Sequence, residues 1–197
     1  MQKLTLADIT PPAEYEPRRA AFRAMIIEHK KPRRVPVGDR VSFVFEDRQT
    51  IKFQIQEMCR VERITEPEKI AEEVAVYNDL IPDTGELVAT MFVEVPDSSQ
   101  IVAVLNALVG LRDMVVLEVG RERIKAQTIP NHGADDRLAA VEYLKFRLTP
   151  SAVAALRSGA EAALVTEHPR YSHRTVLSAA TRQALLEDLS DAPAALA

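Results

Sequence analysis

The segment Gln54–Ile64 combines a dense set of polar and charged side chains with an apolar stripe. In a helix, Gln56, Arg60 and Arg63 fall on one face. Glu57 then lies within one turn of Arg60. Two arginines on one face can hold a carboxylate or phosphate by paired hydrogen bonds. Ion pairs along a solvated helix face give the same pattern and are commoner than sites. The segment is therefore a candidate anion-binding or partner surface.

The segment Glu167–Arg174 places two histidines, a tyrosine and two arginines just after a predicted strand. His168 and His173 can bind a divalent metal or transfer protons near neutral pH. Tyr171 and Arg174 can contact a ligand or a partner. Two histidines are too few for a zinc site, which has at least three protein ligands. Side chains that could complete such a site are His132, Asp135, Asp136 and Glu142. The alternative is a loop that holds the last helix through the Tyr171 hydroxyl and histidine hydrogen bonds.

A third polar group, His29–Arg34, follows a predicted helix that also carries Arg18, Arg19 and Arg23. Cations are favourable at the carboxyl end of a helix, where they face its partial negative charge. The chain has a net charge of -4, whereas nucleic-acid binding needs a basic surface. We therefore interpret this group as a solvated helix end and expect no nucleic-acid partner.

Several classes of protein are disfavoured by what the sequence lacks. A single cysteine, Cys59, allows no intramolecular disulfide, and we expect it to be a buried apolar side chain. No apolar run approaches the roughly 20 residues of a membrane helix, and the amino terminus lacks the apolar core of a signal peptide. The common nucleotide-binding and zinc-protease motifs are missing. These observations favour a cytoplasmic protein without a membrane partner.

Hydrophobic periodicity predicts alternating groups of helices and strands. Helices are expected over Pro17–His29, Gln49–Ile64, from the capping box Thr65–Glu68 onward, from Asp97 to Leu108, over Pro150–Gly159 and over Thr181–Leu189. Strands are expected over Arg40–Asp47, Leu87–Val95, Val115–Val119, Arg123–Thr128, Val141–Leu148 and Ala162–Glu167. The spacing of Ile51, Phe53 and Ile55 also suits a strand, so the start of the second helix is ambiguous. This order predicts an α+β fold with a mixed or antiparallel sheet and helices packed against it.

Residues 1–190 are expected to form a single α+β domain, with a helical part to about residue 82 and a sheet-rich part from about residue 85. The turn Pro82–Gly85 marks the boundary between the two parts. Val35–Asp39 is expected to be a turn-rich connector and Pro130–Asp136 a loop. Residues 191–197 are expected to be a frayed tail.

Many of these segments together resemble an uncharacterised bacterial family of the domain-of-unknown-function type. The resemblance rests on Lys3–Ile9, Phe45–Arg48, Gln54–Met58, Arg60–Ile64, Tyr77–Pro82, Glu142–Phe146, His168–Tyr171 and His173. It covers nearly the whole chain, which implies one integrated domain. Members of this family are often encoded beside rubrerythrin-like proteins and iron–sulfur oxidoreductases, which implies a redox context.

Two hypotheses for function follow. The first is a non-catalytic cytoplasmic accessory protein that binds a rubrerythrin-like or iron–sulfur partner and forms a homodimer, with no cofactor of its own. Its contact surfaces would be the helix from Gln54 and the segment His168–Arg174. The second is an enzyme or small-molecule binder in which Arg60 and Arg63 hold an anion. In that case His168, Tyr171 and His173 supply acid–base groups or bind a divalent metal.

Overall fold

The computed structural model describes residues 1–130 and 138–190 and shows an α+β fold, as the sequence predicts. The helices are α1 (Pro12–Lys30), α2 (Arg48–Val61), α3 (Pro67–Tyr77), α4 (Ile101–Ala107), α5 (Pro150–Arg157) and α6 (Ala179–Asp188). The strands are β1 (Arg34–Val37), β2 (Val41–Glu46), β3 (Glu86–Val93), β4 (Val115–Val119), β5 (Glu122–Lys125), β6 (Gln127–Ile129), β7 (Val141–Arg147), β8 (Ala162–His168) and β9 (Tyr171–Val176). Short 3-10 helices lie at η1 (Leu6–Asp8), η2 (Asn78–Leu80), η3 (Ser98–Gln100) and η4 (Leu111–Met114).

The strands form two sheets, and every described strand pair is antiparallel. Sheet A has the order β1-β2-β3-β7-β6, and sheet B has the order β5-β4-β8-β9. The edge strands β5 and β6 follow each other directly in the chain, so one extended segment leaves sheet B and enters sheet A. Between them, the Ala126 amide still donates to the Val115 carbonyl at 2.9 Å. The two sheets are therefore joined covalently along one edge.

The opposite edges of the two sheets are joined by Tyr171, the first residue of β9. Its hydroxyl donates to the carbonyl oxygen of Val37 at 2.7 Å. The hydroxyl oxygen of Tyr171 in turn accepts from the amides of Arg40 at 2.8 Å and Val41 at 3.0 Å. These bonds satisfy backbone groups of the β1–β2 turn, which would otherwise be costly to bury. The tyrosine thereby fixes that turn against sheet B.

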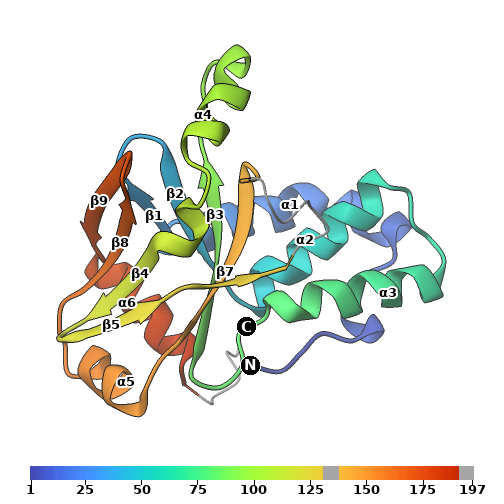
Figure 1. The fold of residues 1–197 in the computed structure, drawn as a ribbon. Coiled ribbons are helices and arrows are strands. Elements are labelled where there is room, and N and C mark those ends of the chain that lie inside the picture. The colour runs from blue at the N-terminus through green and yellow to red at the C-terminus, as the bar shows by residue number, and fades with distance from the viewer. Residues whose placement is uncertain (131–137, 191–197) are drawn as a thin grey trace.

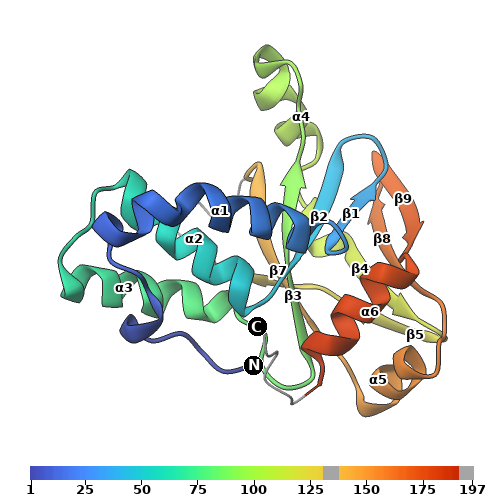
Figure 2. The same cartoon turned by 180° about the vertical axis from the view of Figure 1, so that it is seen from behind.

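The larger hydrophobic core lies between the facing sheets. Alternate residues of β2 and β7 point into it, among them Phe43, Phe45, Leu144 and Phe146. Helices α5 and α6 pack at one end of the two sheets (Figure 2) and contribute further apolar side chains to this core. The contributions of the two helices are Ala152 and Leu156 from α5 and Leu185 from α6, with Leu189 just beyond it.

A second core fills the other face of sheet A, where helices α2 and α3 pack (Figure 1). Ile51, Ile55 and Cys59 of α2 recur at helical spacing and meet Val88 of β3. Cys59 is fully buried, as expected for an apolar side chain in a core. Sheet A is thus covered on both faces, and all six residues of β2 are buried.

Several predicted boundaries differ from the structure. The first helix begins at Pro12 and includes Pro17 in its second turn, where the missing amide removes one intrahelical hydrogen bond, to the carbonyl of Ala13. The segment around Val35 is strand β1 instead of a connector, because it pairs with β2. The capping box at Thr65 does not form, since α3 starts after Glu66 without a side-chain cap.

The segment predicted as a loop after residue 167 is also different. His168 ends β8 and Tyr171 begins β9, so the segment is a tight hairpin in which the two residues pair. The segment around Ile51, for which the sequence also allowed a strand, is helical from Arg48 onward. Asp47 caps this helix by accepting from the amides of Gln49 and Thr50. It ends at Val61, three residues before the predicted end. The expected loop and tail at residues 131–136 and 191–197 lie outside the described residues.

Strands β1 and β2 precede the predicted boundary at residues 82–85, whereas β3, β7 and β6 follow it. Sheet A therefore combines strands from both sides of that boundary. None of the described helices has the length and apolar character needed to cross a membrane.

Gly38 tests the contact between the β1–β2 turn and Tyr171. Its φ is +72°, and a Cβ there would lie 2.5 Å from the Tyr171 hydroxyl oxygen and 2.7 Å from Cδ2 of His173. We expect Gly38→Ala to lower the free energy of unfolding by clearly more than the roughly 1 kcal/mol of left-handed backbone strain. Gly110→Ala is the matched control, because Gly110 has φ +88° but open space around it. Equal losses in urea unfolding of the two variants would contradict the steric contact.

Candidate functional site

The polar groups on α2 are organised around Glu57. Its carboxylate accepts two hydrogen bonds from the Arg19 guanidinium, both at 2.8 Å, and a third from the Tyr15 hydroxyl at 2.8 Å. Arg60 approaches at 3.4 Å. The hydrogen bonds from Arg19, followed by that from Tyr15, lower the pKa of Glu57 to about 2. Glu57 therefore fastens α1 to α2 as a carboxylate.

Gln56 is buried, and its side-chain amide binds the backbone of Thr10. Its Nε2 donates to the carbonyl of Thr10 at 2.8 Å, and its Oε1 accepts from the amide of Thr10 at 2.9 Å. Arg63 lies beyond the end of α2, exposed and at φ 55°, and is the single non-glycine residue with positive φ in the described parts of the chain. Arg60 points to Glu57, so the structure does not bring the two arginines together as a clamp.

The second predicted cluster is also engaged in internal contacts. Nδ1 of His168 accepts from the Arg170 amide at 3.2 Å, so Nε2 carries the proton that is donated to the Val109 carbonyl at 3.2 Å. The His173 ring packs on Tyr171 with centroids 4.4 Å apart. Arg174 points to the other face of the hairpin and pairs with Glu118 at 2.8 Å and with one further carboxylate.

The two predicted clusters lie on opposite sides of the molecule. The α2 cluster belongs to the helical layer on sheet A, whereas β8 and β9 lie in sheet B, and both views show this separation (Figures 1 and 2). The shared pocket that the enzyme hypothesis requires is therefore not formed by these side chains. Within residues 1–130 and 138–190, no three His, Cys, Asp or Glu side chains gather in a way that could hold a metal ion. The candidate ligands His132, Asp135 and Asp136 lie outside the described residues.

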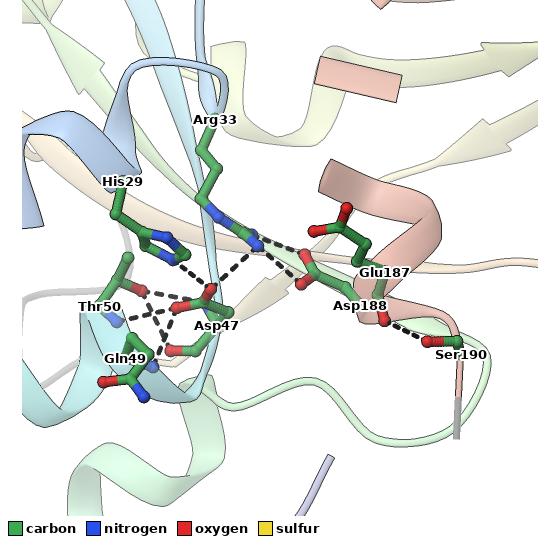
Figure 3. A network of polar contacts seen from close by, with 8 residues as sticks. All are labelled: His29, Arg33, Asp47, Gln49, Thr50, Glu187, Asp188 and Ser190. Carbon is green, nitrogen blue, oxygen red and sulfur yellow. Dashed lines mark hydrogen bonds and ion pairs between the residues drawn. The ribbon is translucent and has the colours of Figure 1, made fainter. Parts of the chain in front are cut away.

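A buried polar network that the sequence patterns do not predict lies between α1, α2 and α6 (Figure 3). The Arg33 guanidinium binds both oxygens of Asp188 at 2.6 and 2.8 Å. It also binds Oδ2 of Asp47 at 2.9 Å, and His29 Nε2 contacts that same oxygen at 2.5 Å. We call these four residues the Arg33 network. It joins the end of α1 and the start of α2 to the last residue of α6.

Two members of the network, Asp47 and Arg33, lie next to helix ends. Asp47 is the cap of α2, and its other carboxylate oxygen accepts from the amides of Gln49 and Thr50 at 3.0 and 2.8 Å. Arg33 follows α1 in the basic run predicted to be solvated, but it is only 3% exposed. That prediction is wrong for Arg33 because two carboxylates replace the water that a buried guanidinium loses.

Burial and charge shift the two carboxyl groups in opposite directions. Burial raises the pKa of Asp188 to about 6 in spite of its hydrogen bonds from Arg33. The pKa of Asp47 is lowered although burial opposes this, because His29 hydrogen-bonds to it and Arg33 lies beside it. One guanidinium thus serves two carboxylates that differ in how readily they take up a proton.

The sequence patterns also do not predict an arm, residues 94–110, whose second half is largely apolar. It runs from the end of β3 through η3 and α4 and projects beyond both sheets in both views (Figures 1 and 2). Val104, Leu105 and Leu108 pack against the larger core at its base. Ile101, Val102 and Val109 are exposed, and Val102 keeps 70% of its surface in contact with solvent. Apart from Asn106, α4 therefore carries apolar side chains on both its packed and its exposed faces.

Replacing Arg33 tests the network. We expect Arg33→Leu to lower the free energy of unfolding by about 3–5 kcal/mol, because it leaves two buried carboxylates without their cation. The control is Arg34→Ala, since the Arg34 side chain is 49% exposed in its pair with Glu94 and such pairs contribute about 1 kcal/mol or less. Urea unfolding at neutral pH measures both, and similar losses would show that the network contributes little.

Arg63 allows a prediction of the opposite sign. Glycine adopts positive φ without strain, so Arg63→Gly is expected to raise the free energy of unfolding by about 1 kcal/mol. Arg60→Gly is the control, because a glycine inside α2 lowers stability by about 1 kcal/mol. A lower midpoint of thermal unfolding for Arg63→Gly would contradict the strain.

Comparison with known proteins gives a family and a solved relative. A family model described as "Protein of unknown function (DUF3501)" matches residues 3–189. A crystal structure from Burkholderia pseudomallei K96243, described as a novel protein of unknown function, is 32% identical, with a TM-score of 0.91 over 96% of this chain and 100% of the other. None of the curated proteins matches. The resemblance to a family of unknown function is thus confirmed: the chain belongs to the DUF3501 family.

Proposed function

We propose that this protein is a non-catalytic accessory protein that binds another protein through the arm. The observation that carries this proposal is the exposure of apolar side chains on α4 at the point farthest from the two sheets. Apart from Asn106, α4 is apolar all round, and helices of that kind are normally buried within a protein or an assembly. A contiguous apolar surface exposed on a soluble protein marks an interaction site.

The length of α4 supports the same conclusion. The helix has seven residues, whereas an isolated helix shorter than about 12–15 residues is marginal in water. Val104 and Leu105 are held by the core, but Ile101 and Val102, at the start of the helix, are exposed. A groove on a partner would cover these side chains and stabilise the helix in the same step.

The composition of the arm indicates which kind of partner surface could bind it. From Ser98 to Leu111 the chain carries no charged residue. A charged partner surface would lose water here without gaining an ion pair, so the partner must offer an apolar and uncharged groove. We assign the partner to the redox proteins, of the rubrerythrin-like or iron–sulfur type, because the family resemblance implies that neighbourhood. The protein would then act by recruiting or stabilising the partner and would need no cofactor of its own.

A lysine at the exposed end of α4 tests this function. Val102→Lys places a charge where the partner groove is apolar, and a central contact of this kind contributes about 2 kcal/mol or more, which is roughly a 30-fold loss of affinity. Val61→Lys is the matched control, because Val61 is 61% exposed at the end of α2 and lies outside the arm. Affinity is measured by calorimetry with the purified rubrerythrin-like or iron–sulfur protein encoded beside the gene.

The proposal is supported if wild type and Val61→Lys bind alike while Val102→Lys binds weakly. Equal binding of all three proteins would exclude the arm as the interface. Sedimentation of the chain alone supplies a further outcome. If wild type is a homodimer that Val102→Lys dissociates and no redox protein binds, the arm belongs to a second copy of this chain and the redox partner is wrong.

A further inference from the structure

The Arg33 network contains more carboxyl groups than permanent positive charges. It has two carboxyl groups, Asp47 and Asp188, one guanidinium and the imidazole of His29. The exposed fractions of the side chains are 8% for Asp47, 4% for Asp188, 4% for Arg33 and 25% for His29. With a neutral imidazole and two carboxylates, the network has one buried negative charge too many. A buried charge without a partner is costly, so a bound proton stabilises this arrangement.

The charged groups that face the network come from every element packed around it. Asp188 at the end of α6 faces Arg33, Asp47 and His29. Glu46, the last residue of β2, adds a further negative charge near Arg33. Both neighbours of Asp47 from α2, Gln49 and Thr50, contribute uncharged donors. The cations that act on Asp188 are Arg33, which forms an ion pair with it, and His29 when it is protonated.

We propose that the Arg33 network is a single-proton latch for the carboxyl end of α6. With one proton bound, the network is neutral and fastens Asp188 to the α1 and α2 layer. When the proton leaves, Arg33 must be shared between two carboxylates in a buried place, and the end of α6 is held less firmly. This inference is independent of the partner proposed for the arm.

The geometry allows the proton to reside at either end of the network. Both oxygens of Asp188 accept from Arg33, which fits a carboxylate at that end. The 2.5 Å contact between His29 Nε2 and Asp47 fits a proton held between the imidazole and a carboxylate. Because the groups share Arg33, the proton belongs to the network as a whole. His29 is the member through which solvent reaches the network, since it is the most exposed of the four.

The sign of the pH dependence follows from Asp188. Burial raises its pKa from 3.8 to about 6 in the folded protein. The folded state therefore binds this proton more readily than the unfolded state, and the resulting stability is complete below about pH 4 and lost as the pH rises through 6. Asp47 acts in the opposite direction, but its lowered pKa confines that effect to pH values below 3.8. Between pH 4 and 7 the latch is expected to weaken as pH rises.

Release of the α6 end would affect the larger core. Leu185 and Leu189 flank Asp188, and both belong to the core between the sheets. When the latch loosens, these two leucines can become exposed to solvent. The exposure would begin in the last turn of α6. Global unfolding is not required, because a helix end can open locally at much lower free energy.

Hydrogen exchange of the full chain at pH 5 and pH 7, corrected for the intrinsic exchange rates, tests the latch. We expect protection factors in the last turn of α6 to be on the order of tenfold higher at pH 5 in the wild type. Asp188→Asn removes the group that requires the proton, so its protection is expected to be the same at both pH values. Glu187→Gln is the matched control on the same helix, because Glu187 is exposed and should leave the wild-type difference intact.

Equal protection at the two pH values in the wild type, or the same difference in Asp188→Asn, would overturn the latch. If Asp188→Asn does not fold, the ¹³C shift of the Asp188 carboxyl carbon decides the matter in the wild type. That carbon reports directly whether the Asp188 carboxyl group carries the proton. A titration step between pH 5 and 7 supports the latch, and a flat shift over that range rejects it.

Discussion

Burial of sheet A on both faces is the constraint on which the rest of the structure depends. One face meets sheet B across the larger core, and the other meets α2 and α3 across the second core. A sheet covered on both sides cannot send its polar side chains to water, so they must find partners inside. Thr90 accordingly donates to Glu46 at 2.5 Å, and Glu86 pairs with Lys145 at 2.9 Å. Because both faces of the sheet are covered, β2 is buried along its whole length.

Polar contacts at the edges of this arrangement hold segments that apolar packing alone would leave loose. Tyr171 closes one side of the two sheets, and the continuous segment from β5 to β6 closes the other. The Arg33 network then joins the helical layer to α6. The arm is the exception, because it has its base in the core and its end in solvent.

The sequence predicts those parts of the fold that depend on local spacing. The alternation of Leu144 and Phe146 identifies β7, and Gly120 identifies the β4–β5 hairpin. The cap of α2 has a local signal too, since Asp47 is followed by Thr50 three residues later. The partner of Arg33 has none: Asp188 lies 155 residues away in the chain. The expected role of Tyr171 as a hydrogen-bonding anchor is also met, but its target is the β1–β2 turn instead of the last helix. Such contacts depend on tertiary packing, which single-sequence patterns do not encode.

The close approach of Gly38 to Tyr171 and His173 has a consequence for the variation among family members. The three residues share one small volume, although more than 130 positions separate the turn from β9. A side chain at position 38 fits there only if the residues at 171 or 173 become smaller or move. Natural variation at these positions should therefore be correlated. Relatives that retain the tyrosine at position 171 should keep glycine at position 38, and relatives with a smaller residue at position 171 can carry a side chain at position 38.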